Sequence, residues 1–303
     1  MRKSVKFKNS DFDMAGNLYL PEDFNENQKY QAVVCVHPGG GVKEQVAGLY
    51  AQKLSENGFI ALAFDASHQG ESGGEPRYLE NPTARVEDVR CAVDYLTTLP
   101  FVDIEKIGAL GICAGGGYAV NAALTEKRIK AVSGISSVDI GAFFRGDGTE
   151  GSAQANIETL KQVAHQRTLE ANGAEPMYLT YVPSSEDEIT EDTMVLLKEA
   201  YDYYRTPRAQ HPNSTNKFLF QSVDKIIAFT AFYQVDKLLS QPLLMIAGSD
   251  ADTRGFSETA YEMANCEKEL FLVKGATHIA LYDTPEYVKQ VTDKLVEFFS
   301  KNL

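Results

Sequence analysis

The segment with the clearest chemical potential is Lys106–Ala119, which reads KIGALGICAGGGYA. A hydrophobic run ends in GICAG at positions 111–115, and a run rich in Ala and Val follows. This pattern is typical of a nucleophile elbow, a strained strand-to-helix turn that exposes a nucleophile at a helix N-terminus. The helix amides there favour a thiolate. Cys113 is therefore the candidate nucleophile, and the alternative is a structural thiol in a glycine-rich turn.

A thiol nucleophile needs a base, and His278 is the best placed of the five histidines. It follows the last expected strand, Glu269–Val273, which is where the histidine of a triad ordered nucleophile, acid, histidine belongs. His165 and His211 lie in polar segments and are weaker candidates. His68 lies in a loop near the carboxyl edge of the expected sheet and is a candidate substrate contact.

The acid of such a triad would follow the strand Pro242–Ala247, where the sequence reads GSDADTR. Asp250 and Asp252 compete for the role, and Asp252 is preferred. Asp139 is a third candidate, because the acid can also follow the preceding strand, Ile129–Ile135. The acid would accept the imidazole Nδ1–H, fix its tautomer and stabilise the imidazolium.

An oxyanion hole is predicted beside the first buried strand, where Val33–Gln45 reads VVCVHPGGGVKEQ. Glycines leave backbone N–H groups accessible, which suits a tetrahedral oxyanion. Gly39 and Gly40 are candidate donors from this loop, and Ala114, directly after the nucleophile, is the second donor. The His37 side chain is expected to hold the loop.

The elements that must position these residues follow from the hydrophobic pattern. Short apolar runs alternate with amphipathic stretches, which predicts βαβ units and a mainly parallel sheet with helices on both faces. Ser4–Asn9 and Asn17–Leu20 are expected to form an antiparallel edge pair. The buried strands are expected at Gln31–Val36, Phe59–Asp65, Lys106–Ile112, Ile129–Ile135, Pro242–Ala247 and Glu269–Val273. Helices are expected over Thr83–Leu99 and from Thr284 onward.

About a hundred residues separate two of these strands, far more than an ordinary connection. The pattern predicts a core at residues 1–136 and 241–303, interrupted by a helical cap at residues 137–240. Helices are expected there over Ser152–Asn172, Glu191–Tyr204 and Gln221–Leu239. The cap aromatics Phe143, Phe144, Tyr203 and Tyr204 are expected mainly to pack the cap onto the core.

Composition excludes several classes of function. The net charge is −13 and the basic residues are scattered, which argues against nucleic-acid binding and against an anionic membrane surface. The N-terminal residues have no signal-peptide pattern, and no apolar run is long enough to span a membrane. The four cysteines show no metal-ligand spacing. We expect a cytoplasmic protein with free thiols, no cofactor and no bound metal, as a monomer or homo-oligomer.

Four motifs together resemble the α/β-hydrolase superfamily, in particular its dienelactone-hydrolase-like and peptidase-S15-like branch. They are HPGGGVKEQ, FDASHQGESGG, GICAGGGYA and the pair GSDADTR and GATH. The resemblance covers nearly the whole chain and implies an eight-stranded core with a helical cap. It implies a triad of Cys113, Asp252 and His278. One departure is that true dienelactone hydrolases carry a glutamate near the oxyanion loop, which here reads HPGGG.

The chemistry that these residues predict is hydrolysis of a small carboxylic ester, lactone or thioester through a thioester acyl-enzyme. Thiolate is a good leaving group, so a cysteine enzyme favours activated acyl substrates. An acyltransferase using the same site is the main alternative. A ligand-binding or redox-sensing protein on an inactive hydrolase fold is the third.

Overall fold

The computed structural model describes residues 1–303 and contains one eight-stranded sheet with the order β1-β2-β4-β3-β5-β6-β9-β10. The pairs β1/β2 and β2/β4 are antiparallel, and every other pair is parallel. The mainly parallel sheet and its antiparallel edge, both predicted from the sequence, are confirmed. The strands are β1 Arg2–Asn9, β2 Phe12–Tyr19, β3 Tyr30–Val36, β4 Ile60–Phe64, β5 Val102–Ile112, β6 Ile129–Ile135, β9 Leu243–Gly248 and β10 Lys268–Val273.

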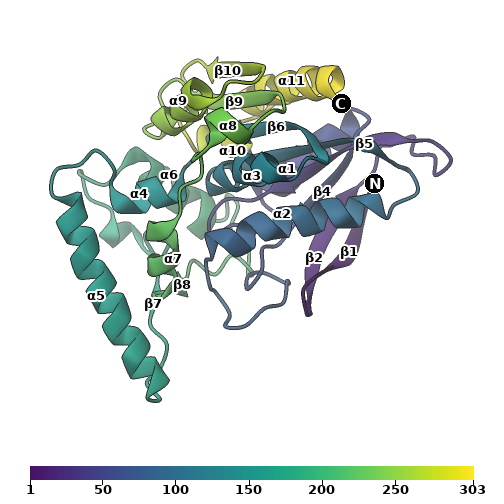
Figure 1. The fold of residues 1–303 in the computed structure, drawn as a ribbon. Coiled ribbons are helices and arrows are strands. Elements are labelled where there is room, and N and C mark those ends of the chain that lie inside the picture. The colour runs from purple at the N-terminus through teal and green to yellow at the C-terminus, as the bar shows by residue number, and fades with distance from the viewer.

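Helices cover both faces of this sheet, and alternate strand residues pack against each layer (Figure 1). Val33 and Cys35 of β3 belong to the apolar cluster of one face, whereas Val34 and Val36 belong to that of the other. Because both faces are covered, inner strands such as β4 and β9 are continuous, fully buried apolar runs. The helices of the first face are α1 Val46–Glu56 and α11 Pro285–Asn302; those of the second are α2 Pro82–Thr97, α3 Ala114–Thr125 and α9 Arg254–Met263.

The predicted stripe on α2 is buried, at Val86, Val89, Val93 and Leu96. The helix begins where Asn81 caps it by accepting the Thr83 N–H and where proline occupies the first turn. No helix of the structure is both long and apolar enough to cross a bilayer.

The insertion between β6 and β9 is largely helical, and its long helix α5 extends away from the body of the molecule (Figure 1). The helix expected over Gln221–Leu239 is interrupted, because Phe229 is extended and Gln234 has a φ of 65°. Arg145 and Asp139 bind the backbone of this interruption, at the Phe229 carbonyl and the Ala231 N–H. The elements are α4 Ile140–Arg145, α5 Ser152–Ala171, β7 Tyr178–Leu179, the 3₁₀ turn Glu186–Glu188, α6 Val195–Arg205, β8 Phe218–Leu219, α7 Ser222–Ala228 and α8 Val235–Leu238.

The parallel strands place the candidate functional segments at one edge of the sheet. The glycine loop follows β3, and Cys113 follows β5. The GSDADTR segment begins at the last residue of β9, and His278 follows β10. The carboxyl ends of parallel strands are where α/β sheets bind their ligands. The short helix α10, Ala280–Asp283, comes directly after His278.

Candidate active site

Cys113 occupies the sharp turn between β5 and α3. Its φ of 55° and ψ of −124° lie outside the regions that an L-residue prefers. Three backbone hydrogen bonds hold this conformation: its N–H donates to the Ile135 carbonyl at 3.0 Å, and its carbonyl accepts from Gly116 and Val138, each at 2.9 Å. A side chain at Gly115 would overlap the Val36 carbonyl, so the close approach of helix and loop requires glycine there. The elbow predicted from the sequence is thus present as a strained backbone.

The Cys113 side chain lines a cavity of about 190 Å³, to which the core contributes residues on one side and the insertion on the other. Fourteen of its 17 lining residues are hydrophobic, and none carries a charge. From the insertion, Phe143, Phe144, Leu196 and Tyr204 line the cavity, whereas Tyr203 packs outside it. The site therefore suits an uncharged, apolar group beside a thiol.

Two backbone amides are available next to the thiol. The Gly39 N–H donates to no backbone carbonyl, and Ala114 is the first residue of α3, where N–H groups have no acceptor within the helix. Burial raises the pKa of the Cys113 thiol, although the amides of Ala114 and Gly39 act in the opposite direction. These two expected oxyanion donors therefore lie beside Cys113.

Gly40 has a different position from Gly39. Its φ is +71°, and a Cβ there would lie 2.6 Å from the Tyr181 ring of the insertion. Its carbonyl accepts a hydrogen bond from Ser214 Oγ at 2.7 Å, and the residue does not line the cavity. Gly40 thus lets the loop turn beneath Tyr181, and the structure favours Gly39 over Gly40 as the donor.

His278 is buried, with 1% of its surface exposed. Its Nδ1 lies 2.5 Å from Thr253 Oγ1, and its Nε2 lies 3.2 Å from Tyr282 Oη. The ring forms no ion pair with a carboxylate, and burial lowers its pKa to about 3. His278 is therefore a neutral imidazole held between two hydroxyl groups.

None of the three aspartates considered for the triad reaches His278. The exposed Asp252 turns its Oδ2 to the Leu196 N–H at 3.0 Å, in the first turn of α6. A carboxylate is favourable at a helix N-terminus. Asp250 accepts a hydrogen bond from Ser249, and Asp139 caps α4. The structure corrects the expected triad, because Thr253 occupies the place of the acid.

The thiol of Cys113 and the imidazole of His278 are not hydrogen-bonded to each other. The Tyr282 hydroxyl hydrogen-bonds His278 Nε2, and Tyr282 also lowers the pKa of the thiol against the effect of burial. Tyr282 is buried and lines the cavity. The nucleophile and base named from the sequence are thus brought together through a third residue.

His68, the candidate substrate contact, is not brought to this site. It has a φ of 70°, and its ring faces that of Phe12 with 6.1 Å between centroids. Burial lowers its pKa, and it does not line the cavity. Its N–H and carbonyl pair with Gly73 and Tyr78, so the residue organises its own loop.

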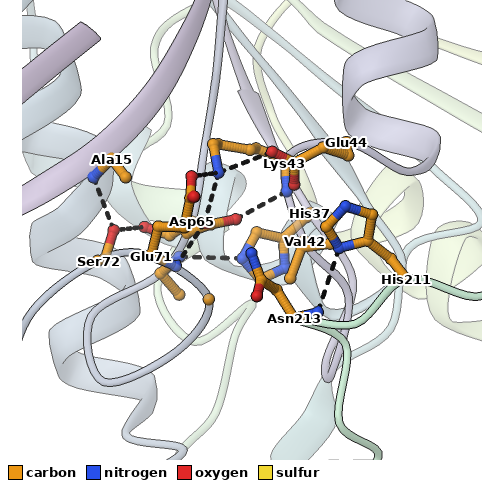
Figure 2. A network of polar contacts seen from close by, with 12 residues as sticks. Ala15, His37, Val42, Lys43, Glu44, Asp65, Glu71, Ser72, His211 and Asn213 are labelled. Carbon is orange, nitrogen blue, oxygen red and sulfur yellow. Dashed lines mark hydrogen bonds and ion pairs between the residues drawn. The ribbon is translucent and has the colours of Figure 1, made fainter. Parts of the chain in front are cut away.

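Figure 2 shows how the loop that carries Gly39 is anchored to the end of β4. Lys43 is 2% exposed, and its Nζ contacts Asp65 at 2.8 Å, Glu71 at 2.6 Å and Glu44 at 2.8 Å. The Lys43 N–H also donates to Asp65 Oδ1 at 2.9 Å. His37 Nε2 accepts from the Ala66 N–H at 3.0 Å, in agreement with the structural role expected for it.

A second buried cluster joins the insertion to the same loop. Glu80 is fully buried and accepts hydrogen bonds from Tyr181 at 2.8 Å and from Tyr118 at 2.7 Å. Arg85 donates to the His37 carbonyl at 2.7 Å and lies 3.6 Å from Glu80. Tyr181 is thereby fixed above Gly39 and Gly40.

Sequence reasoning did not identify Thr253, Tyr282 or Tyr181. Thr253 directly follows the favoured acid, and Tyr282 follows His278 by four residues, the spacing at which side chains meet on one helical face. That spacing was an available signal. Tyr181 lies in a polar part of the insertion, where no periodicity points to the site.

With this geometry established, comparison with known proteins places the chain in a family. The model of the "Dienelactone hydrolase family" matches residues 14–135. The uncharacterized protein YcjY of Escherichia coli strain K12 is 42% identical over the whole of both chains. The chain belongs to the dienelactone-hydrolase-like α/β-hydrolases. The crystal structure of hypothetical protein PA2218 from Pseudomonas aeruginosa is 36% identical to this hydrolase, covers 100% of it and 94% of its own chain, and has a TM-score of 0.92.

Two fungal relatives of this α/β-hydrolase have names that describe acyl chemistry. Acyltransferase drtE of Aspergillus calidoustus is 24% identical over 98% of this chain and 96% of its own. Thiohydrolase aneE of Aspergillus aculeatus is 35% identical over 44% of this chain and 40% of its own. These relatives and the family support a hydrolytic type of enzyme.

Proposed function

We propose that this α/β-hydrolase cleaves small carboxylic esters, lactones or thioesters with an uncharged, apolar acyl group, through a thioester on Cys113. The observation that carries the proposal is the strained elbow, which presents the thiol to an apolar cavity beside the amides of Gly39 and Ala114. Acyl transfer needs a nucleophile with oxyanion donors beside it.

The charge state of the site supports general-base catalysis by a neutral pair. Burial raises the pKa of Cys113 and lowers that of His278, so the resting site holds a thiol and an imidazole rather than an ion pair. His278 takes up the thiol proton as the sulfur attacks the carbonyl carbon. The oxyanion is then held by the two amides, where one such donor contributes roughly 3 kcal/mol to transition-state stabilisation.

The rest of the cycle follows from the same groups. Collapse of the tetrahedral intermediate breaks the bond to the alcohol or thiol, which leaves with the proton from His278. The acyl group remains on Cys113 as a thioester. Water then attacks this thioester, gives its proton to His278, and releases the carboxylic acid and the thiol.

An acyltransferase is the second candidate, and the apolar lining of the cavity favours it. A mostly apolar lining disfavours water relative to a larger, less polar acceptor. The similarity to acyltransferase drtE also favours an acyltransferase. The two functions differ in whether the acyl-enzyme reacts faster with water or with an added thiol or amine.

Intact-protein mass spectrometry after brief mixing with 4-nitrophenyl butyrate tests the proposal. We expect a transient butyryl adduct and turnover in the wild type, both lost in Cys113→Ala. Cys266→Ala is the matched control, since Cys266 is the other partly exposed cysteine. Equal release by wild type and Cys113→Ala, without an adduct, would refute the proposed function. Added cysteamine that captures the acyl group faster than water would identify the acyltransferase.

A further inference from the structure

The Tyr282 hydroxyl is the one hydrogen-bond partner of the His278 ring that also lines the cavity. Its Oη lies 3.2 Å from His278 Nε2, and Tyr282 lines the same cavity as Cys113, close enough to lower the pKa of the thiol against the effect of burial. No direct hydrogen bond joins thiol and imidazole. Tyr282 and Cys113 line the cavity, whereas His278 does not. The base is thus separated from the reacting atoms by the phenol.

We propose that the Tyr282 hydroxyl relays the proton between Cys113 and His278, so that the imidazole acts on the thiol through a phenol. This inference rests on the proposed function of Cys113. It adds a catalytic residue from the lining of the same cavity as the reacting sulfur, and it assigns His278 to the outer end of the relay.

The hydrogen-bond directions in this chain are consistent with a relay. When His278 Nδ1–H donates to Thr253, Nε2 has a free lone pair and accepts from the Tyr282 hydroxyl. The hydroxyl oxygen then accepts from the thiol S–H. Burial raises the pKa of Tyr282 well above its ordinary value, so the phenol stays neutral and can donate and accept at once. In this arrangement the thiol donates to the phenol and the phenol donates to the imidazole, so both protons can move in one concerted step.

The step balances without any further reactant. The S–H bond of Cys113 breaks as its proton joins the Tyr282 oxygen, and the phenolic proton joins His278 Nε2. The products are a thiolate, a neutral phenol and an imidazolium. The thiolate electron pair forms the carbon–sulfur bond, and the carbonyl π pair becomes the oxyanion. When the leaving group departs, His278 Nε2 returns its proton to the Tyr282 oxygen and the phenolic proton passes to the departing oxygen or sulfur, while the acyl group stays on Cys113.

The packing around Tyr282 keeps its ring in place. The residue is 1% exposed, and its N–H donates to the Ile279 carbonyl at 2.8 Å. The Tyr203 ring packs edge-on against it, with 5.1 Å between centroids. The hydroxyl is therefore positioned without a bound substrate, as a relay requires.

The test compares Tyr282→Phe with Tyr203→Phe, a matched control that removes a neighbouring hydroxyl outside the cavity. Butyrylation of Cys113 is followed by rapid-quench mass spectrometry, and alkylation of the thiol by iodoacetamide is followed against pH. We expect Tyr282→Phe to slow acylation by at least about a hundredfold, the lower range for proton transfer by a positioned group. Its KM should change little, because the ring remains.

The pH profile separates a relay from a purely structural role. Since the phenol donates to the thiolate, its loss should move the alkylation profile of Cys113 to higher pH, and Tyr203→Phe should leave the profile unchanged. Acylation and alkylation of Tyr282→Phe at wild-type rates would overturn the relay and leave the proposed function intact. A wild type that forms no acyl adduct would instead overturn the proposed function, and the relay with it.

Discussion

Nδ1 of His278 lies 2.5 Å from Oγ1 of Thr253, in the place where a triad carboxylate was expected. A hydroxyl can fix the orientation and tautomer of the ring, but it carries no charge to stabilise an imidazolium. This agrees with the pKa of His278, which burial lowers to about 3 without an opposing carboxylate. The His278 ring is therefore oriented by a hydrogen bond, as in a triad, but it lacks the negative charge that a triad carboxylate would place beside it.

Substitution of Thr253 should show how much that orientation contributes. In Thr253→Val the buried Nδ1–H loses its only partner, which costs roughly 1–3 kcal/mol, or about a tenfold to hundredfold loss of kcat/KM. Thr253→Ser keeps the hydroxyl and should retain most of the activity. Steady-state kinetics with 4-nitrophenyl butyrate measures both variants. Equal activity of Val and Ser variants would mean that the hydrogen bond has no catalytic role.

Asp252→Asn distinguishes the geometry of the structure from the triad expected from the sequence. Asp252 binds the Leu196 N–H rather than His278, and an asparagine amide oxygen can accept the same hydrogen bond. We expect kcat/KM to stay within about threefold of wild type, a change of under 1 kcal/mol. A loss of about 10⁴, as when a triad aspartate is removed, would identify Asp252 as the working acid.

The depressed pKa of His278 predicts a pH-dependent contribution to stability. The unfolded side chain takes up a proton below pH 6.5, whereas the folded one does so only near pH 3. Its stabilising contribution is complete above pH 6.5 and is lost as pH falls towards 3. The slope is about 1.4 kcal/mol per pH unit, so the loss between pH 7.5 and 5.0 is about 2 kcal/mol.

His278→Gln isolates this contribution, because other titrating groups, such as His37 and Asp88, are the same in both proteins. Urea unfolding at pH 7.5 and 5.0 gives the free energy of unfolding at each pH. The decrease on acidification should be about 2 kcal/mol smaller in the variant. An unchanged decrease would show that His278 is protonated in the folded protein at pH 5.0.

The sequence predicted the positions of Cys113 and His278 because each follows a buried strand, and parallel strands end at one edge of the sheet. The partners of His278 could not be derived in this way. A shift of one residue in the turn after β9 decides whether Asp252 or Thr253 faces the ring. The Asp252 carboxylate is also bound by the Leu196 N–H of α6. The break between α7 and α8 likewise depends on tertiary contacts from Arg145 and Asp139, which local periodicity does not encode.

The cavity lining predicts a preference among acyl groups. Because its residues are uncharged and mostly apolar, each methylene that enters the cavity should contribute about 0.8 kcal/mol, or roughly fourfold in kcat/KM. The rate should rise from acetate through propionate to butyrate. The glutarate half-ester should be a poor substrate, since its carboxylate would lose hydration without gaining a partner. Background hydrolysis is measured with Cys113→Ala, and a preference for the glutarate ester would contradict the proposed apolar site.

The ion pair between Lys43 and Asp65 supports the loop that carries Gly39, and its removal should destabilise the protein strongly. Asp65 is fully buried, and burial raises its pKa despite the opposing effect of Lys43. Lys43→Met leaves this carboxylate without its counter-ion, which typically costs about 3–5 kcal/mol. Because a protonated Asp65 needs no counter-ion, the deficit should shrink as pH is lowered from 7.5 to 5.0. The double variant Lys43→Met/Asp65→Asn removes both charges and should recover much of the free energy of unfolding measured in urea. A single variant within about 0.5 kcal/mol of wild type, the range of ordinary surface substitutions, would show that the pair does not stabilise the fold.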